Sequence, residues 1–312
     1  MVKLAFVAVA IALGLLVAGE IGLRVLFGFG NPLLYIADDR IGYLLAPNQR
    51  TRRFGNRVDI NQYSMRSKPI SPQPDASTVR VLLLGDSIAS GGWWTDRDDT
   101  ISARMAECLR DRSGRQKVEV LNASANSWGP RNELAYLERF GHFQSRAIVL
   151  LVNTDDLFAI APTSLPVGRD LNYPARKPLL AWAEAIERYL LPEPKIPELD
   201  RLRQEGGDRV GKNLAAIEQI HRQLAAEGIP LILALSPLKR EVSPSGPKDY
   251  ELKARDRLLE LTRTQNIPFL DFLPIFGESD RPDALYRDTI HPTPEGNQIL
   301  SDRICQLLVT VW

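Results

Sequence analysis

The sequence predicts an α/β protein: a doubly wound parallel sheet covered by helices, with a transmembrane helix at the N-terminus. Two observations predict the sheet. Five short apolar runs follow residue 78, and stretches with apolar residues at helical spacing separate them. A third observation predicts the transmembrane helix, since residues 4–23 form a nearly uninterrupted apolar segment.

The N-terminal segment determines the expected compartment. Between Lys3 and Arg24 the only charged residue is Glu20, and about 20 apolar residues cross a bilayer. One cation before the segment favours an anchor with the N-terminus inside. A cleavable signal peptide, with small residues at 17–19, and a buried core helix are the alternatives. We assign residues 1–28 to a signal anchor, which places the rest in the periplasm, or outside the cell if the segment is cleaved.

The remaining chain divides into two parts. Residues 29–78 are rich in Pro, Arg, Asn and Gln and lack periodicity, so we expect a membrane-proximal extension, with room for a short hairpin, and a linker. Residues 79–312 form the α/β domain. The expected strands lie at 79–84, 118–121, 147–152, 230–235 and 267–270. The last helix begins near Thr293 and runs toward Trp312. Residues 159–207 are too long for a crossover, so we expect an insertion with Trp182 on a helix of its own.

The composition excludes several classes of protein. With 44% hydrophobic and 25% charged residues, the chain is neither disordered nor collagen-like. Its 39 Lys+Arg and 38 Asp+Glu give a net charge of +1, which argues against nucleic acid as a partner. Two cysteines without a Cys-x-x-Cys motif exclude a zinc ribbon. The oligomeric state cannot be deduced from the sequence.

A serine and a histidine at opposite ends of the domain are the candidate catalytic residues. Ser87, in Gly85-Asp86-Ser87, directly follows the first strand, where side chains line the ligand crevice of a parallel sheet. A serine nucleophile needs a base, and the chain has three histidines. His142 and His221 suit surface or structural roles. His291 lies in a polar loop three residues after Asp288, whose carboxylate can reach the far ring nitrogen.

These blocks resemble the SGNH hydrolases, also called GDSL-like esterases, in a membrane-anchored bacterial form. The resemblance covers about residues 79–312 and implies a flavodoxin-like, five-stranded doubly wound parallel sheet. It implies Ser87 as nucleophile, with its backbone N–H in the oxyanion hole, and Asp288 and His291 as the other members of the triad. It implies no metal and no organic cofactor.

Two middle blocks depart from the family pattern. Where the family places a glycine whose N–H binds the oxyanion, this chain has Ser127. Where the family has Gly-x-Asn-Asp, the chain reads Asn153-Thr-Asp155-Asp. Asp155 thus occupies the position of the donor Asn, where an ionised carboxylate would repel the oxyanion. Asn153, two residues earlier, is the favoured replacement donor, against a shifted alignment or an altered hole.

The resemblance and the compartment together lead to a functional expectation. We expect a serine esterase that acts on acyl esters, O-acetyl first, of extracytoplasmic glycans by hydrolysis or transfer. A lipid esterase or thioesterase is one alternative, and an inactive glycan-binding or assembly factor is another. Trp93 and Trp94 could stack on a sugar ring or make a structural contact.

The two cysteines are expected on neighbouring helices. Cys108 follows the first strand and Cys305 belongs to the last helix, so both lie on one face of the predicted sheet. An extracytoplasmic compartment permits a disulfide. Two separate buried thiols are nevertheless favoured, because Cα atoms on facing helices often lie beyond the ~7 Å limit for bridging.

Overall fold

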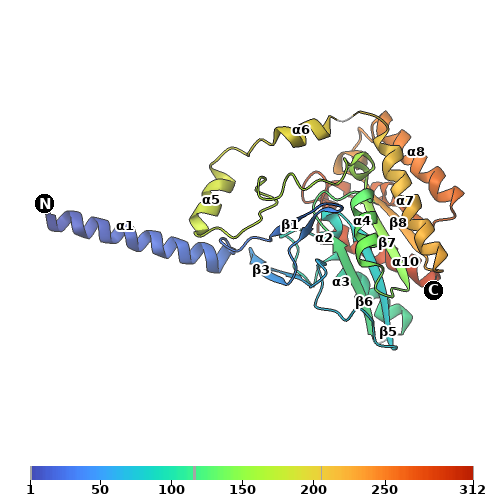
Figure 1. Ribbon diagram of the computed structural model, residues 1–312, viewed down its shortest axis with the longest axis horizontal. Helices are drawn as coiled ribbons and strands as arrows, with labels where there is room; N and C mark the ends of the chain where they lie inside the picture. The colour runs from blue at the N-terminus through green and yellow to red at the C-terminus, as the bar shows by residue number, and fades with distance from the viewer. Residues whose placement is uncertain (1, 115–116, 205, 312) are drawn as a thin grey trace.

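The computed structural model describes residues 2–114, 117–204 and 206–311. Five parallel strands form the central sheet, in the order β6-β5-β7-β8-β9 (Figure 1). Their bounds are β5 (Thr78–Gly85), β6 (Lys117–Ser124), β7 (Ala147–Asn153), β8 (Leu231–Ser236) and β9 (Phe269–Asp271). Because the first strand of this sheet lies second in the order, the topology is flavodoxin-like, which confirms the predicted fold.

The central strands are apolar because both of their faces are covered. Every residue of β7 and β8 is buried. Along β5, Leu82 and Leu84 pack into one core cluster, whereas Val81 and Leu83 pack into the other. This alternation follows from the two-residue period of a strand. The sheet therefore separates two hydrophobic cores.

Two sets of helices cover the two faces. On one face lie α3 (Ile101–Ser113), α9 (Phe272–Gly277) and α10 (Pro294–Val311). On the other lie α4 (Pro130–Phe140), α7 (Arg209–Ala226) and α8 (Asp249–Thr264). α10 begins where the sequence predicts the last helix, and Trp312 lies outside the described residues.

The segment before β5 folds into two antiparallel hairpins. β1 (Tyr35–Asp38) pairs with β2 (Gly42–Leu45), and β3 (Gln49–Arg53) pairs with β4 (Asn56–Ile60). Side chains from this segment, among them Tyr43 and Met65, join the core cluster on the α4 face. The stretch expected as extension and linker thus contributes to the hydrophobic core of the α/β domain.

The prediction of two separate thiols is wrong. Cys108 on α3 and Cys305 on α10 form a disulfide with a Cα–Cα separation of 6.3 Å. The two helices do lie side by side on one face, as expected, and they approach closely enough to fall within the bridging limit. The disulfide joins positions 197 residues apart in the chain.

The N-terminal helix projects from the body and meets the insertion at its base (Figure 1). α1 (Val2–Gly22) continues as a turn of π-helix, η1 (Leu23–Phe27). Among the described residues, Val2–Phe27 is the one helix long and apolar enough to cross a membrane. The insertion holds α5 (Ala181–Tyr189) and α6 (Pro197–Arg203), so Trp182 lies on a separate helix as predicted. Four short elements complete the chain: α2 (Ser87–Ser90), η2 (Thr154–Phe158), η3 (Lys239–Val242) and η4 (Pro282–Leu285).

Candidate active site

The structure brings Ser87, His291 and Asp288 together at the carboxyl edge of the sheet. The Nε2 of His291 lies 2.9 Å from the Oγ of Ser87. The Nδ1 of the same ring lies 3.0 and 2.9 Å from the two carboxylate oxygens of Asp288. In this arrangement the imidazole can take the serine proton while the carboxylate stabilises the imidazolium that results.

Ser87 owes its position to the turn that follows β5. Asp86 caps the short helix α2 by accepting a hydrogen bond of 2.8 Å from the N–H of Ile88. Ser87 is the first residue of that helix, so its N–H has no partner within the helix. The strand end and the cap therefore present both the hydroxyl and a backbone donor at the same point.

His291 is held by its own loop. The carboxylate of Asp288 accepts hydrogen bonds from the backbone N–H groups of Ile290 (3.0 Å) and His291 (2.8 Å). The loop is closed by a β-bridge between Tyr286 and Pro292. Desolvation would raise the pKa of Asp288, but the hydrogen bonds from these two N–H groups and from the imidazole outweigh it and lower the pKa. Asp288 therefore stays ionised, as its partner role requires.

Trp93 and Trp94 form an aromatic wall beside His291. The indole of Trp94 lies 4.5 Å from the ring of His291, centroid to centroid. The guanidinium of Arg287 lies over the rings of Trp94 (4.7 Å) and Trp93 (5.2 Å). Gly92 has a φ of 50°, and a Cβ there would overlap the Trp94 indole, so this position requires glycine. Trp94 thus makes a structural contact with the site.

The loop that carries both tryptophans is held by a buried arginine. The guanidinium of Arg66 donates hydrogen bonds to the backbone carbonyls of Ser90, Gly92 and Thr95. Arg66 is only 4% exposed, and burial lowers its pKa to about 10. The sequence did not reveal this residue, because the loop and Arg66 lie far apart in the chain and no local pattern connects them.

We expect Arg66→Ala to weaken both stability and activity. The change leaves three loop carbonyls without their donor, which costs about 1–3 kcal/mol for each group that stays buried. The loop should loosen, and KM should rise because Trp93 and Trp94 lose their fixed position. Thermal melting and steady-state kinetics measure the two effects. Arg57→Ala is the matched control, since Arg57 binds Asp96 at the exposed end of the same loop and should cost less than about 1 kcal/mol. Equal losses in the two variants would contradict the assignment.

Ser127 has a backbone conformation that favours glycine, the residue the family has at this position. It lies just beyond β6 with a φ of 55°, in the left-handed region. Its hydroxyl accepts a hydrogen bond of 2.9 Å from the hydroxyl of Tyr173, in the insertion. The strand ends of β5 and β6 are paired at Gly85 and Ser124, so Ser127 and Ser87 follow neighbouring strands at the same edge of the sheet.

Asn153 and Asp155 differ in environment. Asn153 is buried, and its side-chain N–H groups donate to the carboxylates of Asp86 and Asp156, both at 2.8 Å. Its amide is therefore committed to these two groups in this structure. Asp155 is exposed at the start of η2. Desolvation raises its pKa, with Glu251 adding to the shift and Arg240 and Lys248 opposing it.

Three buried carboxyl groups lie beneath the nucleophile. Desolvation raises the pKa of Asp86 and, more strongly, those of Asp156 and Glu133. Both carboxyl oxygens of Glu133 are buried without a hydrogen-bond partner among the described residues. Carboxyl groups so close together and so deeply buried are not all ionised at neutral pH. No local sequence signal marks Asp156 or Glu133, although Asp86 adjoins the predicted nucleophile.

The other two histidines have different surroundings. His142 follows α4, and its Nε2 lies 3.0 Å from a carboxylate oxygen of Glu227. His221 lies on α7. Of the three, only His291 is hydrogen-bonded to Ser87 in the part of the chain that the structure describes.

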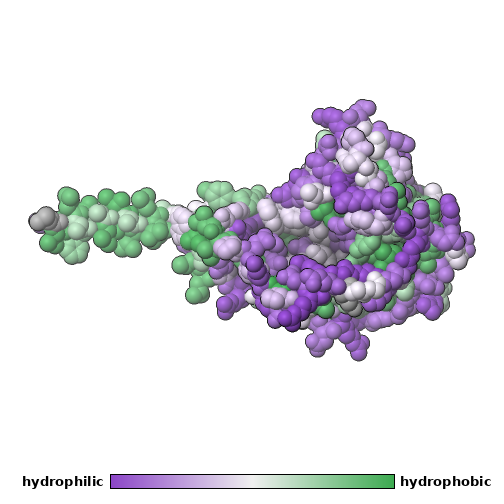
Figure 2. Space-filling view, turned by 90° about the horizontal axis from the view of Figure 1, so that it is seen from above, coloured by the Kyte–Doolittle hydropathy of each residue, from purple (hydrophilic) through white to green (hydrophobic). Residues whose placement is uncertain are grey.

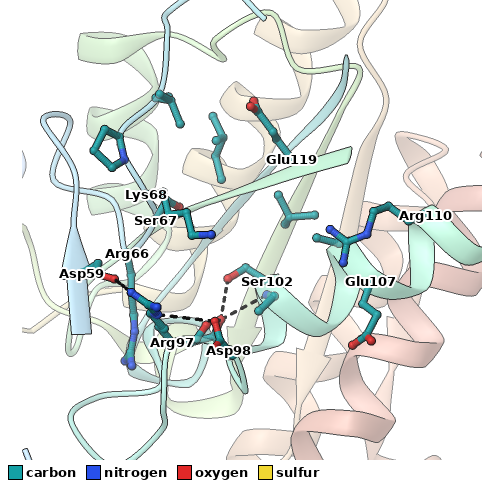
Figure 3. A pocket seen from close by; sticks show the side chains of 17 residues that line it. Asp59, Arg66, Ser67, Lys68, Arg97, Asp98, Ser102, Glu107, Arg110 and Glu119 are labelled. Carbon is teal, nitrogen blue, oxygen red and sulfur yellow. Dashed lines mark hydrogen bonds and ion pairs between the residues drawn. The ribbon is translucent and has the colours of Figure 1, made fainter. Parts of the chain in front are cut away.

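Two hollows lie near these elements. A small one, of about 70 Å³, lies beside the aromatic wall and is lined by residues that include Arg53, Trp93, Trp94, Asn126 and Arg188. A larger one, of about 540 Å³, lies between α3, β6 and residues 66–70 (Figure 3). In the larger hollow Arg97 is paired with Asp59 at 2.7 Å, and none of the triad residues lines it. None of the triad residues lines the smaller hollow either, but Trp94 lines it and packs against His291.

The fold and the site define a class: an α/β protein with a serine, a histidine and an aspartate aligned at the carboxyl edge of a parallel sheet. Residues 83–299 match the model of the GDSL-like Lipase/Acylhydrolase family. The chain belongs to this family, and it is accordingly an acyl-ester hydrolase by family. No curated protein matches the chain by sequence.

Two solved structures are similar to the chain at low identity. The acetyl xylan esterase AlAXEase is 15% identical, with a TM-score of 0.51 over 73% of this chain and 99% of that one. A lipase/acylhydrolase from Enterococcus faecalis is 14% identical, with a TM-score of 0.47 over 74% of this chain and 95% of that one. At 15% identity the likeness to AlAXEase shows the fold alone.

Proposed function

We propose that the protein is a membrane-anchored serine esterase that removes or transfers short acyl groups, O-acetyl first, on glycans outside the cytoplasm. One observation carries the catalytic part of the proposal: the Oγ of Ser87 lies 2.9 Å from the Nε2 of His291, while Asp288 holds the opposite nitrogen. This is the relation that activates a serine toward an ester carbonyl.

The reaction proceeds in two halves. Ser87 attacks the ester carbonyl, His291 accepts the hydroxyl proton, and the C–O bond to the alcohol breaks as His291 returns the proton to the leaving oxygen. An acyl-enzyme remains on Ser87. Water, or a second hydroxyl in the transfer reaction, is deprotonated by His291 and attacks the acyl carbon, which restores the serine. Asp288 stabilises the imidazolium in both halves.

Backbone donors supply the oxyanion hole in this proposal. The N–H of Ser87 is free of intrahelical bonding at the start of α2, where the helix dipole also favours negative charge. The N–H of Ser127 is the second donor. Asn153 positions the nucleophile indirectly. Its amide donates a hydrogen bond to the carboxylate of Asp86, which caps the helix α2 that begins at Ser87.

Several features support the substrate class and the compartment. In this proposal the acyl group enters the hollow of about 70 Å³ that reaches the site through Trp94. This volume is far smaller than the ~300–1,000 Å³ of pockets that hold drug-sized ligands, which favours acetyl over a fatty-acyl chain. A structural neighbour is named an acetyl xylan esterase. The disulfide suits an oxidising compartment. Contacts between α1 and the insertion, described below, favour a retained anchor over a cleaved signal peptide.

An acetyl-ester assay tests the proposal. The full chain should hydrolyse a chromogenic acetyl ester and release acetate from acetylated glycan, and Ser87→Ala should do neither. Substrates of increasing acyl length separate this proposal from a lipid esterase, since activity should fall as the acyl chain lengthens. A wild-type protein that binds acetylated glycan yet releases no acetate would be a binding factor instead.

Restoring the family asparagine at position 155 should raise activity. Asp155 replaces a neutral donor, and its raised pKa leaves it neutral at low pH and negatively charged at high pH. If Asp155 faces the oxyanion hole as its counterpart in the family does, its charged form repels the oxyanion. The ratio of kcat for Asp155→Asn to kcat for the wild type should then increase with pH, toward the about 10²–10³-fold that one donor contributes. Taking the ratio cancels the titration of His291, which both proteins share. A ratio below one at every pH would mean that the carboxylate assists the reaction.

A further inference from the structure

An apolar surface surrounds the base of the N-terminal helix. We call it the collar. Its members are large, exposed hydrophobic side chains: Ile21, Val25, Leu26, Phe27, Phe54, Leu179, Leu180, Trp182, Ile186, Tyr189, Leu190 and Leu191. Figure 2 shows hydrophobic residues gathered where α1 meets the body. Leu179 and Leu190 are 94% and 76% exposed, a degree of exposure that indicates an interaction surface when it is contiguous.

One end of α5 is fixed to α1. The carboxylate of Glu20 accepts hydrogen bonds from the backbone N–H groups of Ala181 (2.9 Å) and Trp182 (3.2 Å). Glu20 thus caps α5, which has no side-chain cap of its own. The indole N–H of Trp182 donates to the carbonyl of Leu16 at 3.0 Å. A Cβ at Gly19 would overlap that indole, so glycine permits the close approach.

The middle of α5, at Glu184, and its C-terminal end, at Tyr189, contact the segment after η1 and strand β3. Glu184 is buried, accepts a hydrogen bond of 2.7 Å from the N–H of Gly30 and forms an ion pair of 2.8 Å with Arg53. The ring of Tyr189 lies 6.1 Å from that of Phe29, edge to face. Since both ends of α5 are held by polar and aromatic contacts, its exposed apolar side chains are presented on a rigid element and are not part of a loose flap.

The level of this contact along α1 matches the thickness of a bilayer. An α-helix rises about 1.5 Å per residue, so a hydrocarbon core of ~30 Å that begins near Leu4 ends about 20 residues later, near Leu23. Glu20 and Arg24, where α5 is attached, lie at that level. Trp and Tyr are enriched at membrane interfaces, and the collar carries Trp182 and Tyr189. The exposed cations Arg52, Arg176 and Lys177 lie in the collar's own segments, where anionic headgroups would meet them.

We propose that the collar lies in the interfacial layer of the bilayer that α1 spans, so that α5 is a second membrane contact with lipid as its partner. This inference rests on the proposed membrane anchor and adds a fixed orientation to it. The chain of aromatic contacts from Phe54 to Trp93 (5.2 Å) and from Trp93 to Trp94 (5.7 Å) then connects the membrane surface to the wall of the active site.

Lipid-attached quenchers test the inference on the full chain. Leu190→Cys is labelled with an environment-sensitive fluorophore and reconstituted in vesicles of phosphatidylethanolamine and phosphatidylglycerol; the native cysteines are protected in their disulfide. Leu252→Cys on α8 is the matched control, because Leu252 is also an exposed leucine, at 43%, and α8 lies at the end of the molecule away from α1. Spin-labelled lipids should quench the label at 190 at least about twofold more than the label at 252.

The outcomes distinguish the anchor from the collar. If alkaline extraction removes the chain from the vesicles, the anchor and the collar are both overturned. If the chain resists extraction but aqueous iodide quenches both labels equally, only the collar is overturned. A label at 190 that is shielded from iodide and unaffected by spin-labelled lipid indicates cover by a second protein copy, which also overturns the inference. Adding Leu179→Gln and Leu191→Gln to the Leu190→Cys chain should reduce the lipid quenching, and a quenching that stays unchanged would count against the collar.

Discussion

Replacing Ser87 with alanine should lower kcat for acetyl-ester hydrolysis by roughly 10⁴–10⁶-fold while leaving the fold intact, and His291→Ala should have an effect of similar size. Each change removes a chemical role without removing core volume, since Ser87 and His291 are both only partly buried. The double variant should be scarcely worse than either single variant, because the two side chains act as one unit. Steady-state kinetics, with thermal melting to confirm folding, measures these effects.

Two matched histidine variants control for this result. His142→Ala and His221→Ala should keep kcat within a few-fold of the wild type, because neither ring is hydrogen-bonded to Ser87 in the described structure. Asp288→Asn should lower kcat less than His291→Ala does, because it keeps the imidazole base and removes only the carboxylate that stabilises the imidazolium. Full activity in His291→Ala would disprove the assignment of the base.

Removing the Cys108–Cys305 disulfide should have a large effect on stability. A bridge that closes so long a segment is worth about 2–5 kcal/mol. The double variant Cys108→Ser, Cys305→Ser should therefore melt roughly 5–15 °C lower than the oxidised protein. Most of the loss should appear as faster separation of α3 from α10, the two helices that the bond joins.

The reduced wild type provides the comparison for the double variant. The reduced wild type keeps both thiols in place. The difference in melting temperature between the oxidised and the reduced wild type therefore reports the cross-link, and the difference between the reduced wild type and the double variant reports the packing of Cys305, which is fully buried. Reduction should reproduce most of the lower melting temperature. If reduction leaves the melting temperature unchanged, the bond either does not form in the protein or adds no stability.

The parts of the fold that could be predicted from the sequence are those with local signals. The five strands are short apolar runs because both faces of the sheet are buried, and a buried strand followed by Gly85-Asp86-Ser87 places a serine at the carboxyl edge. Asp288 and His291 are three residues apart, so one turn brings them into contact. Their approach to Ser87 then follows from the topology, because both lie beyond strand ends at the same edge.

A short hairpin was expected in the N-terminal segment, but strand β3 could not be predicted because its inward positions are polar. β3 reads Gln-Arg-Thr-Arg-Arg, yet Thr51 and Arg53 are buried. Arg53 is satisfied by Glu184, which lies in the insertion and is far away in the chain. Hydrophobic periodicity cannot detect a strand whose buried side chains are charged and paired over long range.

The disulfide and the direction of the Asn153 amide depend on distances of an ångström or two. The topology predicted that α3 and α10 would be neighbours, but whether they lie within bridging distance depends on how closely the helices pack. Asn153 lies at the expected strand end. Its amide nonetheless donates to Asp86 and Asp156, because two buried carboxyl groups need a donor and Asn153 is the side chain between them.

The capping of α5 by Glu20 limits where the proposed enzyme can work. A flexible tether of n residues would let the domain explore a sphere with a radius of about 5–6 Å × √n. Here the helix of the proposed anchor is bonded to the domain without a tether. If the anchor is retained, it holds the catalytic serine at one height above the lipid. Such an enzyme searches in two dimensions. It modifies glycans that pass through a thin layer next to the membrane, as they emerge or are assembled there. The same ester on glycans farther from the membrane stays unmodified.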